Sequence, residues 1–206
     1  MKKNEKEVMD IVFLLDRSGS MSGMESDTIG GYNGYLKNMK KSNAYVTTVL
    51  FDDKYEMITK RKDINETAYL TEKEYYVRGA TALLDAIGNT INFMDKEKAD
   101  KVLFIITTDG YENASCQFNK EQIKEMIKGH SKWEFMYIGA DIDSYSEGQS
   151  LGIDKSNIAN YIKDQKGIIK MYDAMCLASS SFYENDCLNS SWKQELDKYK
   201  EEGLDK

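Results

Sequence analysis

Two runs of apolar residues constrain the fold of this chain more than any other feature. The segments MDIVFLLD (residues 9–16) and KVLFIITTD (residues 101–109) are almost continuously apolar, and each ends in an aspartate. A strand that is apolar on both faces must be covered on both faces, which is typical of central strands in a parallel sheet flanked by helices. The chain is therefore expected to be an α/β protein.

The segments around these runs alternate in the manner of βαβ units. Further apolar runs of strand length lie at 45–51 and 133–139, and apolar residues recur at helical spacing over 24–41, 81–94, 120–128 and 166–184. The stretch YVTTVLFDDKYEMITK predicts two strands joined by a tight Asp-Asp turn, one of them an antiparallel edge strand. We predict a Rossmann-like, doubly wound, mostly parallel sheet with one antiparallel edge strand and helices on both faces.

Length and composition favour one domain. The 206 residues contain no proline, repeat or linker, so we expect a single domain over residues 1–189. We expect the charged C-terminal tail over 190–206 to be a solvated or frayed helix. The net charge of −7 argues against nucleic acid as the main partner, because that binding requires clustered basic residues. The first residues carry no signal-peptide core or membrane span, and the three cysteines match no zinc spacing. We expect a cytoplasmic protein with free thiols and no membrane partner.

Small oxygen-bearing side chains gather where the predicted strands end. Asp16, Ser18 and Ser20 follow the first strand, Thr81 precedes the helix at 81–94, and Asp109 follows the strand at 101–107. In a doubly wound sheet such positions meet in the ligand crevice. An all-oxygen set suits Mg²⁺ best, with Mn²⁺ or Ca²⁺ as alternatives. Without an ion, two carboxylates 4 Å apart would repel by about 4 kcal/mol.

The motifs DRSGSM, GAT and TTDG resemble, in order and setting, the three loops of the metal-ion-dependent adhesion site of von Willebrand factor A domains. The resemblance implies that Asp16, Ser18 and Ser20 form the first loop, Thr81 the second and Asp109 the third. It implies a protein-binding module whose divalent ion is completed by an aspartate or glutamate of a protein partner. The chain is most similar to the intracellular bacterial and phage branch, whose members often serve as adaptors, some beside AAA+ ATPases.

Each of these residues also fits a purely structural role, and the site as a whole fits more than one function. Taken alone, Thr81 could cap a helix, Asp109 could form a turn before Gly110, and Ser22 could cap the first helix. An aspartate after the first strand also suits a metal-assisted hydrolase such as a phosphatase of the haloacid dehalogenase type. That superfamily needs a second aspartate two residues later, where this chain has Ser18. A structural subunit that has lost its metal is a third alternative. We expect a binding module and no enzyme.

Overall fold

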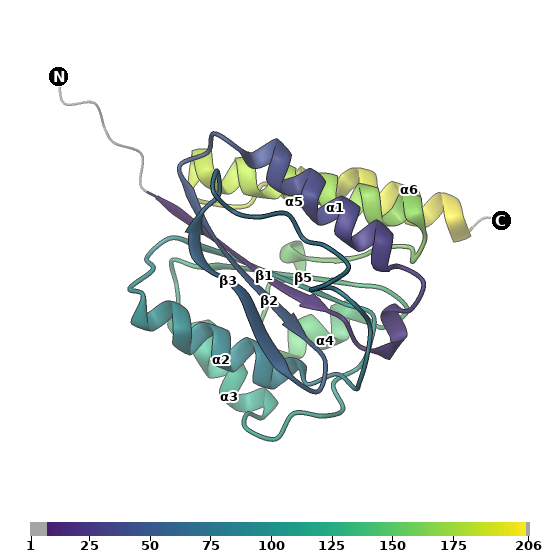
Figure 1. Cartoon of the computed structure of the whole chain (residues 1–206), viewed down its shortest axis with the longest axis horizontal. Coiled ribbons are helices and arrows are strands. Elements are labelled where there is room, and N and C mark those ends of the chain that lie inside the picture. The colour runs from purple at the N-terminus through teal and green to yellow at the C-terminus, as the bar shows by residue number, and fades with distance from the viewer. Residues whose placement is uncertain (1–7, 205–206) are drawn as a thin grey trace.

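The fold is an α/β sandwich built on one six-stranded sheet (Figure 1). A computed structural model describes residues 8–204. The elements follow in the order β1 (Met9–Asp16), α1 (Glu25–Met39), β2 (Ala44–Phe51), β3 (Tyr55–Asp63), α2 (Leu83–Lys96), β4 (Val102–Thr108), α3 (Lys120–Gly129), β5 (Glu134–Gly139), α4 (Ser144–Ser150), β6 (Ile158–Asn160), α5 (Gln165–Asn185) and α6 (Gln194–Leu204).

The sheet has the strand order β3-β2-β1-β4-β5-β6. Strand β1 lies parallel to β2 on one side and to β4 on the other, and only β3 runs antiparallel, at the edge beside β2. The chain builds β2 and β3 on one side of β1 and then β4, β5 and β6 on the other. The order therefore reverses between β1 and β4, and the crevice beyond the carboxyl ends of these strands is the expected ligand position.

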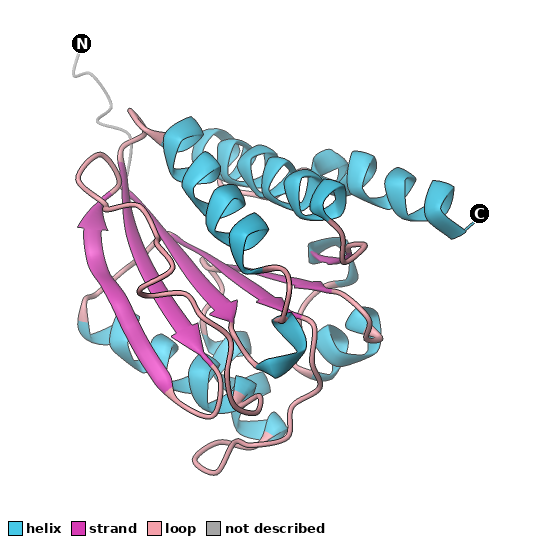
Figure 2. Cartoon of the chain, turned by 45° about the vertical axis from the view of Figure 1, so that its right-hand side comes forward, coloured by secondary structure: helices cyan, strands magenta, loops and turns pink. Residues whose placement is uncertain are grey.

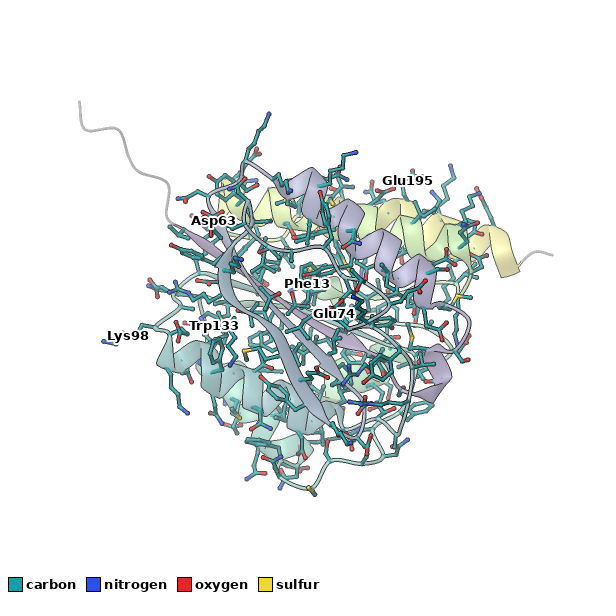
Figure 3. The ribbon with its side chains drawn as sticks, viewed as in Figure 1. Phe13, Asp63, Glu74, Lys98, Trp133 and Glu195 are labelled. Carbon is teal, nitrogen blue, oxygen red and sulfur yellow. The ribbon has the colours of Figure 1, made fainter. Side chains whose placement is uncertain are left out.

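Helices cover both faces of the sheet, as the apolar runs require (Figure 2). Alternate residues of β1 point into two separate cores, with Ile11 and Phe13 in one and Val12 and Leu14 in the other. Helices α1 and α5 enclose the first core, where Phe13 stacks edge-on against two tyrosines of α1, and α2 and α3 enclose the second (Figure 3). Both faces of β1 are thus buried, which explains its continuous apolar sequence.

The predicted fold class is confirmed, including the antiparallel edge strand. The hairpin β2–β3 turns at Asp52 and Asp53, and each predicted strand and helix lies within two or three residues of an observed one. Helix α4 and the three-residue strand β6 were not predicted, because their sequences are short and carry no apolar period. Over residues 8–204, none of the helices combines the length and apolar character needed to cross a membrane.

The charged C-terminal segment is packed against the domain, which corrects the expectation of a solvated tail. Trp192 and Leu196 are buried in the core beneath α5, and the Trp192 indole donates a hydrogen bond to the Ser156 carbonyl at 3.1 Å. The Tyr199 hydroxyl donates to Asp164 at 2.9 Å. The helix was expected, but a few buried residues among many charges give too weak a period to predict its packing. Its outer face, labelled at Glu195 in Figure 3, is exposed.

Candidate metal centre

The topological switch point brings the two aspartates of the motif together. Asp16 is the last residue of β1, and Asp109 follows directly after β4, the strand next to it. Both side chains are buried. The Thr108 hydroxyl donates to Oδ2 of Asp16 at 2.6 Å and so ties the end of β4 to the end of β1. The fold thus places two carboxylates at the crevice where ligands bind in this class of sheet.

The first loop is shaped by its own side chains. Oδ1 of Asp16 accepts the backbone N–H of Ser18 at 2.7 Å, which turns the chain sharply after the strand. The hydroxyls of Ser18 and Ser20 are 3.0 Å apart, and the Ser20 hydroxyl donates to Oδ1 of Asp109 at 2.5 Å. A single chain of contacts therefore links all four of these residues, with their oxygens directed to one place.

Thr81 completes the cluster from the second loop. Helix α2 begins at Leu83 with Ala82 as its cap, so Thr81 does not cap it. The third loop holds Thr81 in place, since its N–H donates to the Asn113 side chain at 2.9 Å and its carbonyl accepts the Asn113 N–H at 3.0 Å. A Cβ atom on Gly110 would lie 2.9 Å from the Thr81 hydroxyl oxygen.

The three hydroxyls of the motif converge around Gly110. The same Cβ would lie 3.4 Å from Oγ of Ser20 and 3.8 Å from Oγ of Ser18. A residue without a side chain at this position leaves a small cradle rimmed by hydroxyl oxygens beside the two aspartates. The structure thus brings together all five residues selected from the sequence.

The donor chemistry of this cradle fits a hard divalent cation. Burial raises the pKa of the Asp16 carboxyl from the ordinary 3.8 to about 6, against the lowering effect of the bonds from Thr108 and Ser18, and the Asp109 charge adds to the rise. Two buried carboxylates close enough to interact favour a cation between them. Within residues 8–204, no three His, Cys, Asp or Glu side chains form a metal cluster, so a cation here would depend on the hydroxyls as well.

Arg17, inside the motif, is a structural residue that sequence reasoning missed. Its side chain is fully buried, and it donates to Asp52 at 2.8 Å, to Glu56 at 2.6 Å and to the Glu74 carbonyl at 3.1 Å. Arg78 donates to the same Asp52 oxygen at 2.7 Å. Burial alone would raise the pKa of Asp52, but the hydrogen bonds it accepts outweigh burial and lower it.

This ion-pair network holds the first two loops together. The carbonyl of Arg17 accepts the Arg78 N–H at 2.9 Å, and the Gly79 carbonyl accepts the Gly19 N–H at 3.2 Å. Gly79 has φ +69°, and a Cβ there would collide with the Asp53 carboxylate at 2.2 Å. Asp52, which the sequence suggested as a turn residue, therefore anchors the site. A buried arginine in a loop gives no sequence signal, because charged loop residues are normally solvated.

A second unexpected residue, Lys163, reaches the site from the segment after β6. Its Nζ atom lies 2.7 Å from Oδ2 of Asp109 and donates to the backbone carbonyl of Ser20. Among the described residues, Oδ2 of Asp109 accepts no hydrogen bond, so this ion pair is what balances its charge. The chain separates Lys163 from Ser20 by 143 residues, and no local pattern signals their contact.

The single histidine of the chain and the cysteine nearest in sequence to Asp109 lie outside the ligand cluster. His130 bonds to Asp95 at 2.8 Å and to the Met126 carbonyl at 2.6 Å, and its ring stacks on Trp133 just before β5, at the end of the sheet opposite the site. Cys116 lies on the third loop, where its N–H and its thiol contact the Asp85 carboxylate of α2. Neither residue adds a ligand or a base to the cluster.

Neither a family model nor a curated protein sequence matches the chain, but solved structures of other proteins do. Proximal thread matrix protein 1 from the mussel byssus, with a zinc-occupied MIDAS motif, matches with TM-score 0.62 and 16% identity over 82% of this chain and 44% of that one. A von Willebrand factor type A protein from Catenulispora acidiphila matches with TM-score 0.61 and 13% identity, over 84% of this chain and 43% of that one. The pilus adhesin SpaC from Lactobacillus rhamnosus GG, in its open conformation, matches with TM-score 0.67 and 11% identity, over 89% of this chain and 31% of that one.

The chain spans less than half the length of each of these three proteins. At such low identity the likeness establishes the fold alone. The fold is that of a von Willebrand factor type A domain: a Rossmann-like α/β sheet with one antiparallel edge strand.

Proposed function

We propose that this protein is a non-enzymatic, metal-dependent binding module that attaches to an acidic residue of a partner protein. The observation that carries the proposal is the convergence of three hydroxyls around Gly110, beside two buried aspartates at the switch point of the sheet. In this proposal the site is an intact metal-ion-dependent adhesion site. The mussel protein with a zinc-occupied MIDAS motif supports a divalent ion in such a setting.

Five residues would hold the ion: Asp16, Ser18, Ser20, Thr81 and Asp109. Their oxygens suit Mg²⁺ as the physiological ion, with Mn²⁺ and Ca²⁺ as substitutes. When bound, the ion would supply an electrophile for one further carboxylate. The two aspartates balance its two charges formally, while the hydroxyls contribute none, so the partner's acid would form a short, charge-assisted contact. The protein's own part is to hold these oxygens in place and to leave the crevice open to the partner.

A binding role fits the environment of Asp16 better than hydrolysis does. In a dehalogenase-type hydrolase the aspartate after the first strand is the nucleophile, and a second acid two residues later is the general acid. Position 18 carries a serine in place of the acid that the dehalogenase-type mechanism requires. The hydrolase alternative would therefore lack its general acid.

The partner and the location are further parts of the proposal. The resemblance to intracellular bacterial and phage members suggests an adaptor that works in the cytoplasm, with a component of an AAA+ ATPase complex as a candidate partner. Cys116, Cys176 and Cys187 are all free thiols, which is consistent with a reducing compartment.

Capture of partners from the native host tests this proposal. Parent protein and Asp109→Asn should be immobilised in parallel and exposed to host lysate with Mg²⁺ or with EDTA. We expect a protein that binds the parent in Mg²⁺ only, and whose binding falls sharply when one interface glutamate or aspartate is replaced by its amide. Equal capture in EDTA would refute the proposal. Metal-dependent turnover of a phosphatase or esterase substrate, abolished in Asp16→Asn, would instead establish the hydrolase.

A further inference from the structure

We propose that Lys163 is a tethered cation that neutralises Asp109 when no metal is bound and that must leave this carboxylate when a divalent ion enters. Lys163 would thereby set the affinity of the site for metal. This inference rests on the proposed function, because it concerns the same site. It adds to the site a sixth residue, Lys163, which is not a metal ligand but competes with the metal for Asp109.

The ammonium group of Lys163 lies against two of the ligand residues. Nζ of Lys163 contacts one oxygen from each of two ligand residues, Oδ2 of Asp109 and the backbone carbonyl of Ser20. The Asp109 side chain is fully buried, and the Lys163 side chain is only 21% exposed. Charged side chains that meet in such a buried place are paired, because leaving either one alone would carry a large desolvation cost. The lysine is therefore part of the site and is not an incidental surface contact.

The backbone of Lys163 is fixed from both sides. The Tyr161 N–H donates to the Gly139 carbonyl at 2.9 Å, and Asp164 caps α5 by accepting the Gly167 N–H at 2.6 Å. A Cβ on Gly167 would lie 1.9 Å from the Ile162 carbonyl oxygen, so the turn fits tightly against the helix. The lysine is thus presented to Asp109 by rigid structure at both of its ends.

The charge balance of the site changes when a divalent ion enters. Without an ion, the two aspartates bring two negative charges and Lys163 balances one of them. A divalent ion balances both, so the ammonium would then be a surplus positive charge next to a cation. An Asp109 oxygen that is paired with the lysine is also less available to the ion. Metal and lysine therefore compete for Asp109.

The displaced side chain of Lys163 has an open groove beside it. Lys163 lines an open groove of about 810 Å³ beside the site, whose other walls include Tyr111, Tyr145, Tyr161 and Lys200. A rotation of the flexible lysine stem into this groove would free Asp109 without moving the backbone. The rearrangement needs no change in the fold.

Metal titration by calorimetry is the first test. Lys163→Met and Lys163→Gln should each bind Mg²⁺ and Mn²⁺ about tenfold more tightly than the parent. Two neutral side chains of different polarity should give the same gain, because the effect comes from the lost charge. Lys200→Met is the matched control, since Lys200 lines the same groove, and its affinity should equal that of the parent. Unchanged or weaker metal binding in both Lys163 variants would overturn the competition.

A double-mutant cycle in EDTA is the second test, and it does not depend on metal at all. Parent, Lys163→Met, Asp109→Asn and the double variant should be unfolded with urea in EDTA. We expect the folding equilibrium constants to show a coupling of about tenfold between the two positions. Additive effects would show that no ion pair exists and would refute the inference. Coupling in EDTA together with no metal binding by any variant would refute both the metal site and the competition, and would leave only the ion pair.

Discussion

Replacing Asp16 by asparagine should stabilise the metal-free protein at neutral pH. Asparagine keeps an acceptor for the Ser18 N–H, and the Thr108 hydroxyl can accept from its amide group, so both contacts of the aspartate have a counterpart. What the change removes is a buried negative charge. Burial raises the pKa of Asp16 from 3.8 to about 6, and this difference corresponds to about 3 kcal/mol of unfolding free energy.

The sign of this effect depends on pH. The pKa of Asp16 is higher in the folded state than in the unfolded chain, so the folded protein binds more protons between these two values. Stability from this group is therefore fully present below about pH 4 and is lost as pH rises through about 6. Parent and Asp16→Asn should be nearly equal at pH 4. At pH 7 the variant should be more stable by about 3 kcal/mol, which is about 6–12 °C in Tm.

Urea unfolding of both proteins in EDTA at several pH values from 4 to 7.5 measures this difference. Other groups with raised pKa values, such as Glu134, are common to both proteins and cancel in the comparison. Mg²⁺ added at pH 7 to about 1,000 times the Kd of the parent should reverse the order, because the parent then gains about 4 kcal/mol and the variant gains little. A stability difference in EDTA that stays constant from pH 4 to 7 would refute the reasoning.

Three further substitutions test other parts of the structure. Gly110→Ala should lower the affinity for Mg²⁺ by more than about tenfold in calorimetry, since its Cβ fills the hydroxyl cradle, whereas Gly129→Ala, with open space at its Cβ, should not. Parent-like binding by Gly110→Ala would place the ion elsewhere. Arg17→Met should cost about 3–5 kcal/mol in urea unfolding, because it leaves a buried ion-pair network incomplete, and a loss below 1 kcal/mol would contradict this. Trp192→Ala should cost about 3–5 kcal/mol if the C-terminal segment is part of the core, and a neutral change would show that it is not.

The sheet could be predicted because its strands carry their signal locally. The runs that became β1 and β4 are apolar on both faces, and their burial in the centre of the sheet follows directly from that pattern. Strand β6 has three residues and α4 reads SYSEGQS, so neither contains enough apolar residues to show a period. The apolar residues Trp192 and Leu196 lie among charges, and only the tertiary structure shows that they are buried.

The five candidate ligands could be selected because each follows or precedes a predicted element at a motif position. The supporting residues could not, because their roles depend on contacts between distant segments. Arg17 pairs with Asp52 across 35 residues, and Lys163, in the segment after β6, meets Asp109 at the end of β4, past the intervening strand β5. A lysine or arginine in a loop is normally solvated, so its sequence context gives no reason to place it inside a site.

Direct titration of Mn²⁺, followed by electron paramagnetic resonance of the free ion, tests the central claim most directly. The account predicts one bound ion per parent chain, loss of binding in Asp109→Asn, and weaker binding in Ser18→Ala, Ser20→Ala and Thr81→Ala. Asp141→Asn is the matched control, because Asp141 lines the adjacent groove outside the ligand set and asparagine tolerates its positive φ. Binding that is absent from the parent, or that survives in Asp109→Asn and fails in Asp141→Asn, would contradict the account.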